Sequence, residues 1–267
     1  MSGPWVRFAG ASYFLILRNT RFVEAFTDPI TATMRSYALA DGKVMPDGID
    51  LNVLTDMDST TRHWRFLRNQ EFDAAEISCS SYLVARDHEQ RVDVIPVFLH
   101  RRFRHGFLFI NTAKGIRAPG DLAGRKVSVK QFQATAIVWM RGILQHAYGV
   151  PLNSIEWFSD LDKTVDFEPR ADFKITRVPP NASIERMLAE GEIDALLHPD
   201  LIRPLVEKDP RVARHFPDYR RKELPFTKRP ASSRSCMFSA SSGKSLKSTH
   251  GSPSTCSTPS TTPRTSR

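Results

Sequence analysis

The stretch FDAAEISCSSYLVARDHEQRVDVIPVFL, residues 72–99, decides the fold class. Its first seven residues are strand-like, Ser80 to Arg86 has helical spacing, and VDVIPVFL is a continuous apolar run typical of a buried strand. A strand, a helix and a second strand in this order favour a parallel sheet with crossover helices. The stretch therefore predicts an α/β fold.

The same alternation extends in both directions from this stretch. On its N-terminal side GIDLNVL (48–54) is strand-like, and Ser59 to Leu67 has helical spacing. On its C-terminal side we expect a helix over Thr135 to Tyr148 and another over SIERMLAEG, which Ser183 caps and Gly191 ends. Further strands are expected at FRHGFLFIN (103–111), RKVSVK (125–130), IEWFS (155–159), FKITRV (173–178) and IDALLH (193–198).

The length of 267 residues allows two lobes, each with a core of its own. We expect lobe 1 over residues 21–104, lobe 2 over 105–198 and a return to lobe 1 over 199–223. A ragged N-terminus (1–20) precedes the lobes and a disordered tail (224–267) follows them. The tail is predicted from composition, because nineteen of the thirty-seven residues in 231–267 are Ser or Thr and too few are aliphatic to offset chain entropy.

The formal net charge of +9 is concentrated in that tail. Residues 224–267 hold seven Lys or Arg and no acidic residue, which leaves a charge of +2 for the rest of the chain. A protein that binds a phosphate backbone needs its basic residues clustered on a folded face, so we expect no nucleic-acid partner.

Several sequence features bear on location and cofactors. The N-terminal residues lack a clear charged region, a long apolar region and a cleavage site, and no stretch approaches ~20 apolar residues, so we expect a cytoplasmic protein with no membrane partner. Only Cys79 lies outside the tail, which fits a reducing compartment. The histidines form no HxH or HExxH pattern, and we predict neither a metal nor another cofactor. The rings of Trp64 and Trp139 are expected in the core. The sequence leaves the oligomeric state open.

Five strings carry a resemblance to a known family: ALADGKVMPDGIDL (38–51), FDAAEISCSSYLVARD (72–87), IPVFLHRRFRHGFLFIN (95–111), GRKVSVKQFQATAIVWMRGILQHAYGV (124–150) and MLAEGEIDALLHP (187–199). In this order and spacing the chain resembles the 4,5-dihydroxyphthalate decarboxylase family. The resemblance implies a two-lobed fold like that of type 2 periplasmic binding proteins, and non-oxidative decarboxylation of a dihydroxylated aromatic diacid. The alternative is a solute-binding protein that holds an aromatic carboxylate without catalysis, because fold alone does not choose between them.

The tail suggests a frameshift. Read one base out of frame with permitted codons, Pro230 to Phe238 yields TGIFPIMHV, and a second stretch around His250 to Pro263 also resembles the family's C-terminal region. We therefore hypothesise a frameshift near Glu223 to Phe226, which would leave the fold incomplete at its C-terminus and the chain without the family's histidine of that motif. If that histidine is catalytic, the chain is inactive. A natural Ser/Thr-rich tail is the alternative.

The implied reaction sets the residue types to look for. Loss of carbon dioxide leaves electron density on a ring carbon, which must be protonated, and a hydroxyl para to the departing carboxylate can supply electrons if its proton is taken. The second carboxylate needs a cationic clamp. We therefore look for arginines, a histidine or carboxylate, and neutral hydrogen-bonding groups.

The run HRRFRH (100–105) lies where the two lobes join, and a ligand cleft is expected at such an interface. If the run is extended, Arg101 and His105 point to one side and Arg104 to the other. Arg101, Arg104 and His105 match the family's pattern, and Arg104 and His105 are the first choices. The alternative is a solvated or salt-bridged hinge strand.

Other candidates follow strands or lie in the long helix. Arg141 is in an apolar helix, so it must reach either an anionic ligand or a buried acidic partner. Gln133, Thr135, Ser80 and Ser81 lie at helix starts, where they could bind a carboxylate or cap the helices. The predicted catalytic residues are His105 and Glu76, which the sequence does not rank as proton donors. The predicted substrate-binding residues are Arg101, Arg104, Arg141, Gln133, Thr135, Ser80 and Ser81.

Overall fold

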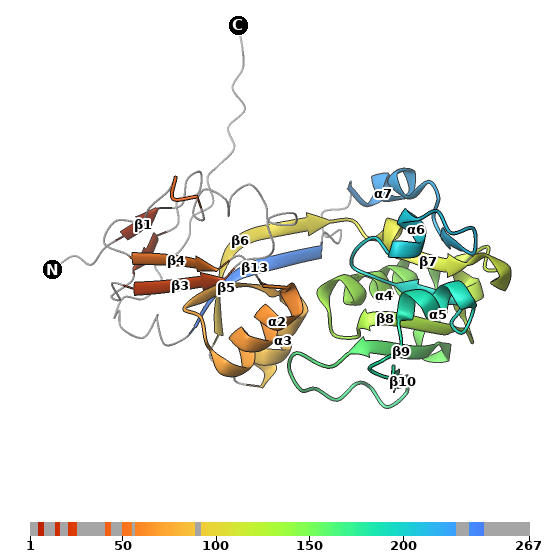
Figure 1. The fold of residues 1–267 in the computed structure, drawn as a ribbon, viewed down its shortest axis with the longest axis horizontal. Coiled ribbons are helices and arrows are strands. Elements are labelled where there is room, and N and C mark those ends of the chain that lie inside the picture. The colour runs from red at the N-terminus through yellow and green to blue at the C-terminus, as the bar shows by residue number, and fades with distance from the viewer. Residues whose placement is uncertain are drawn as a thin grey trace, which may run out of the picture.

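The computed structural model describes residues 5–7, 14–16, 21–25, 41–43, 50–54, 57–88, 92–227 and 235–242. These residues form two separate β-sheets with helices packed against them, which gives the molecule two lobes (Figure 1). Within the first twenty residues, β1 (Trp5–Arg7) and β2 (Phe14–Ile16) pair antiparallel as a two-stranded sheet apart from the two main sheets.

The sheet of lobe 1 has five strands in the order β4-β3-β5-β13-β6. β3, which the sequence did not predict, pairs in parallel with β4 and β5, whereas β13 lies between β5 and β6 and runs antiparallel to both, so the sheet is mixed rather than purely parallel. The helices α2 and α3 both contact β5, and α2 continues into a π-helical turn. The bounds are β3 (Arg21–Ala25), β4 (Asp50–Leu54), α2 (Ser59–Trp64), the π-helical turn (Arg65–Asn69), β5 (Ala74–Ser78), α3 (Cys79–Asp87), β6 (Val92–Arg102) and β13 (Ser235–Ser242).

The strand β13 corrects the prediction of a disordered tail over 224–267. Its residues fill the space between β5 and β6, with Phe238 opposite Ile77 on one side and Phe98 on the other. Composition did not reveal it because a ladder is built from backbone N–H and C=O groups, which a Ser-rich segment supplies as well as an apolar one. Residues 224–227 are also ordered, as the end of a helix, and the remainder of the predicted tail lies outside the described residues.

The sheet of lobe 2 has six strands in the order β10-β9-β8-β11-β7-β12. The first four are parallel, and β7 runs antiparallel to its neighbours β11 and β12, so the sheet is mixed rather than purely parallel. The strands are β7 (Leu108–Asn111), β8 (Lys126–Gln131), β9 (Glu156–Leu161), β10 (Lys174–Arg177), β11 (Ala195–Leu197) and β12 (Val212–Arg214). The helices are α4 (Thr135–Tyr148), α5 (Ile184–Glu190), α6 (Arg203–Val206) and α7 (Tyr219–Thr227), with 3-10 turns at His105–Phe107, Thr112–Lys114, Pro119–Leu122 and Leu152–Ser154.

Two predictions about lobe 2 differ from the structure. The segment 103–111 is not one strand, because a 3-10 turn at His105–Phe107 precedes the short strand β7. The segment 199–223 does not return to lobe 1, because β12 pairs with β7 and so belongs to the sheet of lobe 2. The second difference arises from pairing between distant segments, which local patterns do not report.

The helix ends follow the sequence signals. α4 has the predicted bounds and ends at Gly149, whose φ of 68° is left-handed. The Ser183 hydroxyl accepts a hydrogen bond from the Arg186 N–H at the start of α5, and Gly191 ends that helix with a φ of 77°. The apolar face of α4 packs on β8 and β9 through Ile137, Leu144, Val127, Val129 and Trp157.

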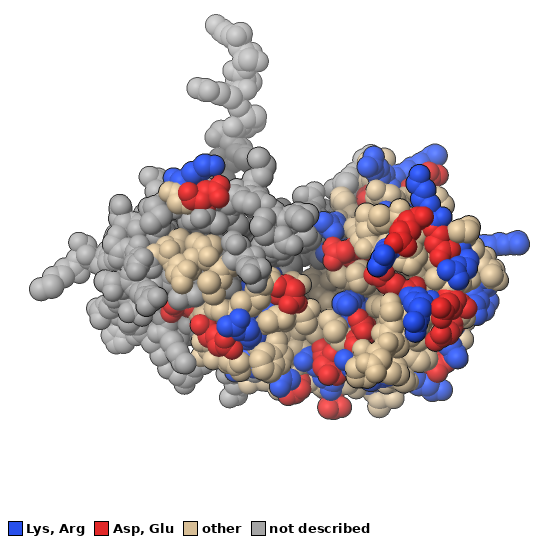
Figure 2. Space-filling model, in the orientation of Figure 1, with Lys and Arg blue, Asp and Glu red and all other residues tan. Residues whose placement is uncertain are grey.

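The surface charge of lobe 2 is mixed on the face that Figure 2 shows. Basic and acidic side chains alternate over it without an extended region of one sign. No helix among the described residues is long and apolar enough to cross a membrane.

Candidate functional site

A cluster of hydroxyl groups joins the two lobes where β5 meets α3 and β8 meets α4. The Thr135 hydroxyl lies 2.6 Å from the Ser78 hydroxyl and accepts a hydrogen bond from the Ser80 N–H at 3.0 Å. The Ser80 hydroxyl donates to the Gln133 carbonyl oxygen at 2.5 Å. The carboxyl ends of strands are the usual place for ligand contacts in open α/β sheets. The structure brings Ser80, Gln133 and Thr135 together at this junction, and their part in substrate binding stays a prediction.

These hydroxyls make contacts between the lobes rather than capping their own helices. Neither Ser78, the residue before α3, nor Ala134, the residue before α4, makes a side-chain cap. Instead, the Thr135 N–H of α4 donates to the Ser78 hydroxyl of lobe 1 at 3.4 Å. Ser81 differs from its neighbours, since it is buried and its hydroxyl has no hydrogen-bond partner among the described residues.

The side chain of Gln133 holds the segment that follows β9. Its amide oxygen accepts from the N–H groups of Thr164 and Val165 at 3.0 and 3.1 Å, and its amide nitrogen donates to the Val165 carbonyl at 3.1 Å. Arg68 of lobe 1 reaches the same segment, donating to the Thr164 carbonyl and pairing with Asp166, both at 3.0 Å. Gln133 thus positions a loop that both lobes contact, and it also lines a cavity within lobe 2.

Glu76 lies buried in the middle of lobe 1. Its carboxylate is 3.5 Å from the Arg62 guanidinium, and the Arg62 Nε donates to the Glu76 carbonyl at 3.1 Å. Burial lowers the pKa of Arg62, and the negative charge of Glu76 partly offsets this effect. Because side chains alternate along a strand, Glu76 shares a face of β5 with Ser78, whose hydroxyl touches the other lobe.

Arg104 is buried at the hinge after β6. Its Nη1 donates to the Pro199 carbonyl at 2.9 Å, and its guanidinium lies 5.7 Å from the centre of the Phe107 ring. Burial lowers the pKa of Arg104 to about 10. Arg102, two residues before Arg104, pairs with Asp200 at 3.2 Å. This ion pair agrees with the alternative interpretation of the run as a salt-bridged hinge strand. The Arg101 side chain lies outside the described residues.

His105 is enclosed by aromatic rings rather than exposed to a ligand-sized space. Its ring centre lies 4.7 Å from that of Phe226, 5.5 Å from that of Phe216 and 6.1 Å from that of Tyr148. Neither ring nitrogen has a hydrogen-bond partner among the described residues, and Glu223 is 4.0 Å away. Burial lowers the pKa of His105 to about 4, so the ring is neutral near pH 7. The cavity that touches Arg104 and His105 has a volume of about 10 Å³, which is far too small for an aromatic acid.

Arg141 takes a position that neither predicted role describes. Its guanidinium lies over the Phe132 ring at 3.6 Å from the ring centre, and its Nη2 donates to the Phe132 carbonyl at 3.1 Å. Burial lowers the pKa of Arg141 to about 10. The structure therefore does not bring Arg104, His105 and Arg141 to one shared cavity among the described residues.

A cleft between the lobes offers space for a small molecule. It has a volume of about 630 Å³ and lies between α2 and the segment after β9. Its lobe 1 side is formed by Thr60, Thr61, Trp64 and Arg68, and its lobe 2 side by Gln131, Arg177 and residues of the 161–166 segment. Trp64 was expected in the core, but it is 44% exposed because it faces this cleft. Ligand sites of this size are commonly found between lobes.

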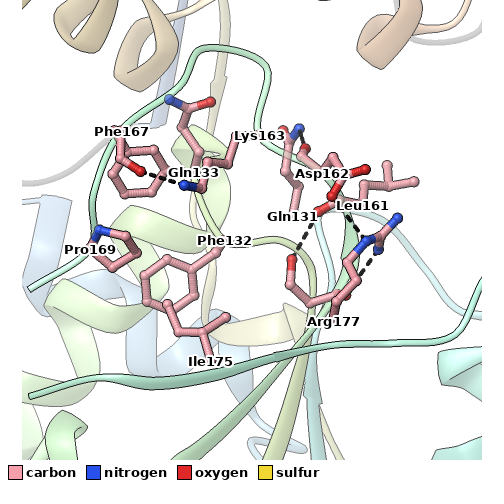
Figure 3. Close-up of a pocket in the computed structure, with 11 residues that line it drawn as sticks. Gln131, Phe132, Gln133, Leu161, Asp162, Lys163, Phe167, Pro169, Ile175 and Arg177 are labelled. Carbon is pink, nitrogen blue, oxygen red and sulfur yellow. Dashed lines mark hydrogen bonds and ion pairs between the residues drawn. The ribbon is translucent and has the colours of Figure 1, made fainter. Parts of the chain in front are cut away.

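A smaller cavity opens beside the cleft within lobe 2 (Figure 3). It has a volume of about 170 Å³ and shares Gln131, Leu161, Asp162, Lys163 and Arg177 with the larger cleft. Sequence reasoning missed Lys163, Arg177, Arg68 and Arg62. Lys163 lies in a segment without a clear pattern, and Arg177 lies in an exposed one. The sequence signal near this cavity is QFQ (131–133), which follows a strand.

Comparison with known proteins decides the family. The chain is 30% identical over 228 residues to a 4,5-dihydroxyphthalate decarboxylase of Pseudomonas putida, covering 82% of this chain and 88% of that protein. The chain belongs to the 4,5-dihydroxyphthalate decarboxylase family. A second family member, from Comamonas testosteroni, is 32% identical over 172 residues, which span 62% of this chain and only 52% of that longer protein. No protein-family model matches the chain.

Solved structures support the fold of this family member. It is similar to the periplasmic aliphatic sulphonate-binding protein SsuA from Escherichia coli, with a TM-score of 0.56 and 11% identity over 86% of this chain and 67% of the other. The alkanesulfonate-binding protein SsuA from Xanthomonas axonopodis pv. citri gives a TM-score of 0.52 and 12% identity over 86% of this chain and 68% of the other. The predicted fold like that of periplasmic binding proteins is therefore confirmed.

Proposed function

We propose that this family member is a non-oxidative decarboxylase of a dihydroxylated aromatic diacid, converting a compound of the 4,5-dihydroxyphthalate type into one of the protocatechuate type. The observation that carries the proposal is the 30% identity to a relative of that name over 88% of its length. The interlobe cleft of about 630 Å³ adds support, because Arg68, Lys163 and Arg177 on its walls can attract a substrate with two carboxylates.

The proposed reaction places a proton on the ring carbon that carries the departing carboxylate. Removal of the proton from the para hydroxyl pushes electrons toward that carbon, which takes up a proton. The bond to the carboxylate then breaks, carbon dioxide leaves, and the bonding electrons restore the aromatic ring. The protein must accept a proton from the hydroxyl, supply one to the carbon and hold the remaining carboxylate.

Of the two predicted acids, the surroundings favour Glu76. Its carboxylate is held by Arg62 and lies on the face of β5 that leads through Ser78 to the lobe junction. His105 is neutral near pH 7, packs against aromatic rings and lines neither the interlobe cleft nor the smaller cavity. We assign Glu76 the acid–base role, Ser80 and Thr135 the role of joining the two lobes, and Arg104 and His105 a structural role at the hinge.

A direct assay tests the proposal. Purified protein is incubated with 4,5-dihydroxyphthalate, and loss of ultraviolet absorbance is measured together with release of carbon dioxide. The assay is run on this chain and on a version whose residues after Glu223 follow the shifted reading frame. Activity in the second version alone identifies the tail as the missing part, and activity in neither overturns the proposal.

Binding without catalysis is the second candidate function. The fold neighbours named above are sulphonate-binding proteins, and a two-lobed fold serves capture as well as catalysis. Calorimetric titration with 4,5-dihydroxyphthalate separates the two functions. Tight binding by both versions with no carbon dioxide from either would establish the binding function instead.

A further inference from the structure

The smaller cavity of lobe 2 has an apolar side and a charged side. Figure 3 shows Phe132, Phe167, Pro169 and Ile175 along one side of the space, and Asp162 and Arg177 on the opposite side. The Lys163 amine lies beside Phe167 on the apolar side, and Lys163 also belongs to the wall of the interlobe cleft. A molecule in this cavity would therefore have an apolar part in lobe 2 and a polar part at the cleft.

The size of the cavity suits one aromatic ring. An apolar cavity of about 150 Å³ engineered in another protein binds benzene, and this one measures about 170 Å³. A ring with two carboxylates would place the ring in the cavity and extend its substituents toward the larger cleft. Longer or fused ring systems would exceed the space.

The apolar wall is held in place before any ligand arrives. The Phe132 ring meets Trp157 and Phe173 edge to face, with ring centres 5.8 Å apart in both pairs. The guanidinium of Arg141 lies 3.6 Å from the Phe132 ring centre. These contacts fix the orientation of the ring, and a preorganised wall lowers the entropic cost of binding.

The two cations of the cavity have weak acidic partners. Lys163 lies 3.8 Å from Glu168, which is 96% exposed, and Arg177 lies 3.1 Å from Asp162, which is 87% exposed. Pairs with such exposed carboxylates contribute little, so a ligand carboxylate can replace them at small cost. Backbone carbonyls orient both cations, through the bonds from Lys163 to Phe167 at 2.6 Å and from Arg177 to Ser159 at 3.0 Å.

We infer that this cavity is the ring-binding subsite for an aromatic diacid, with Lys163 and Arg177 binding its carboxylates. The inference rests on the proposed function for the identity of the acid. Neither cation belongs to the family strings that suggested a substrate site from the sequence, and both lie on segments of lobe 2 that the wall residues also occupy. Arg68 of lobe 1 bonds Thr164 and Asp166 of the segment that follows Lys163.

The test measures equilibrium binding of phthalate, which has the ring and both carboxylates but no hydroxyl to start the reaction. Isothermal titration calorimetry compares the parent chain with Lys163→Gln, Arg177→Gln and the double variant. Each single change removes one charge-assisted contact and is expected to weaken binding about 10-fold, and the double change about 100-fold. Lys174→Gln, an exposed charge on β10 that lines neither cavity, is the matched control and should bind like the parent.

A second pair of measurements tests the ring subsite itself. Ile175→Trp fills the cavity and should abolish phthalate binding, while circular dichroism and the melting temperature report whether the variant folds. Cyclohexane-1,2-dicarboxylate carries the same charges on a thicker, non-aromatic ring and should bind the parent at least about 10-fold more weakly, because the flat wall loses contact with it.

The outcomes separate this inference from the proposed function. Binding that both cation variants retain overturns the subsite, whether or not the protein releases carbon dioxide. Failure of the parent chain to bind phthalate also overturns it. Binding that depends on Lys163 and Arg177, with carbon dioxide released by neither this chain nor the frame-restored version, supports the subsite and overturns the decarboxylase proposal.

Discussion

Arg104 and His105 lie beside aromatic rings at the hinge, and Lys163 and Arg177 lie beside aromatic rings at the cavity of lobe 2. At the hinge the rings enclose the polar groups and leave about 10 Å³ of space. At the cavity the rings form one wall and leave about 170 Å³ in front of the cations. Cations beside aromatic rings thus form a packed hinge in one place and a cavity in the other. The volume left between the side chains distinguishes the two.

The largest expected effect tests whether Glu76, rather than His105 at the hinge, is the acid–base residue. Glu76→Gln keeps the size of the side chain but removes its ability to accept and donate a proton. We expect kcat in a version that releases carbon dioxide to fall by about 10²- to 10⁴-fold, the usual contribution of a general acid or base. Phthalate affinity should stay within about twofold of the parent.

Folding must be checked for that variant, because Arg62 loses a buried ionic partner. If Glu76→Gln melts at a much lower temperature, Glu76→Asp keeps the charge while drawing the carboxylate back by one methylene. Full activity in both Glu76→Asp and Glu76→Gln would remove Glu76 from the mechanism. His105 would then be the remaining predicted acid–base residue.

The hinge gives the next largest effect, which is on stability rather than on rate. The pKa of His105 is about 4 in the folded protein and about 6.5 in an unfolded chain, so below pH 6.5 the unfolded state binds a proton that the folded state does not. The free energy of unfolding should therefore decrease as the pH falls from 6.5 to 4, by about 3 kcal/mol. Burial raises the pKa of the neighbouring Glu223, which acts in the opposite direction, and the positive charge of Lys222 also disfavours the protonated histidine.

His105→Phe isolates the histidine contribution. The variant replaces a ring without hydrogen-bond partners among the described residues by an apolar ring in an aromatic enclosure. Urea denaturation at several pH values should give a smaller decrease in stability at acidic pH than in the parent, with decarboxylation unchanged within a few-fold. Loss of decarboxylation in a folded His105→Phe would break the contrast between the hinge and the cavity.

The parts of this molecule that could be predicted from sequence are those set by local signals. α4 has its predicted bounds because apolar spacing, Gly149 and Pro151 all act within a few residues of its ends. Ser80, Gln133 and Thr135 lie just after the strands β5 and β8, where the local pattern put them, although their contact across two different sheets was not predicted.

Other features depended on contacts that local patterns do not contain. β13 could not be predicted because its pairing with β5 involves the backbones of residues about 160 positions apart. The run HRRFRH predicted the position of the hinge, but not that Phe216 and Phe226 would enclose His105. Lys163 and Arg177 meet at one cavity only because β9 and β10 are neighbours in the sheet.

The lobe junction gives a moderate expected effect. Thr135→Val keeps the shape of the side chain but removes the acceptor for the Ser80 N–H and the partner of the Ser78 hydroxyl. We expect the free energy of unfolding to fall by about 1–3 kcal/mol, the cost of leaving buried polar groups unsatisfied, as measured by urea denaturation. Val138→Thr, at an exposed position one turn further along α4, is the control and should change stability by less than about 0.5 kcal/mol.

The smallest effect is expected at the outer side of the hinge, where Arg102 pairs with Asp200 at 3.2 Å. Both side chains are substantially exposed, at 36% and 59%, and water and salt screen the pair. Arg102→Gln should therefore lower the free energy of unfolding by less than about 1 kcal/mol, and the difference should vanish in 1 M salt. Arg104→Gln, two residues away, removes a buried cation that bonds the Pro199 carbonyl, so its effect on urea denaturation should be larger and insensitive to salt. If the two changes had equal, salt-sensitive effects, Arg104 would be exposed to water. The packed hinge and the open cavity of lobe 2 would then not differ in burial as the comparison requires.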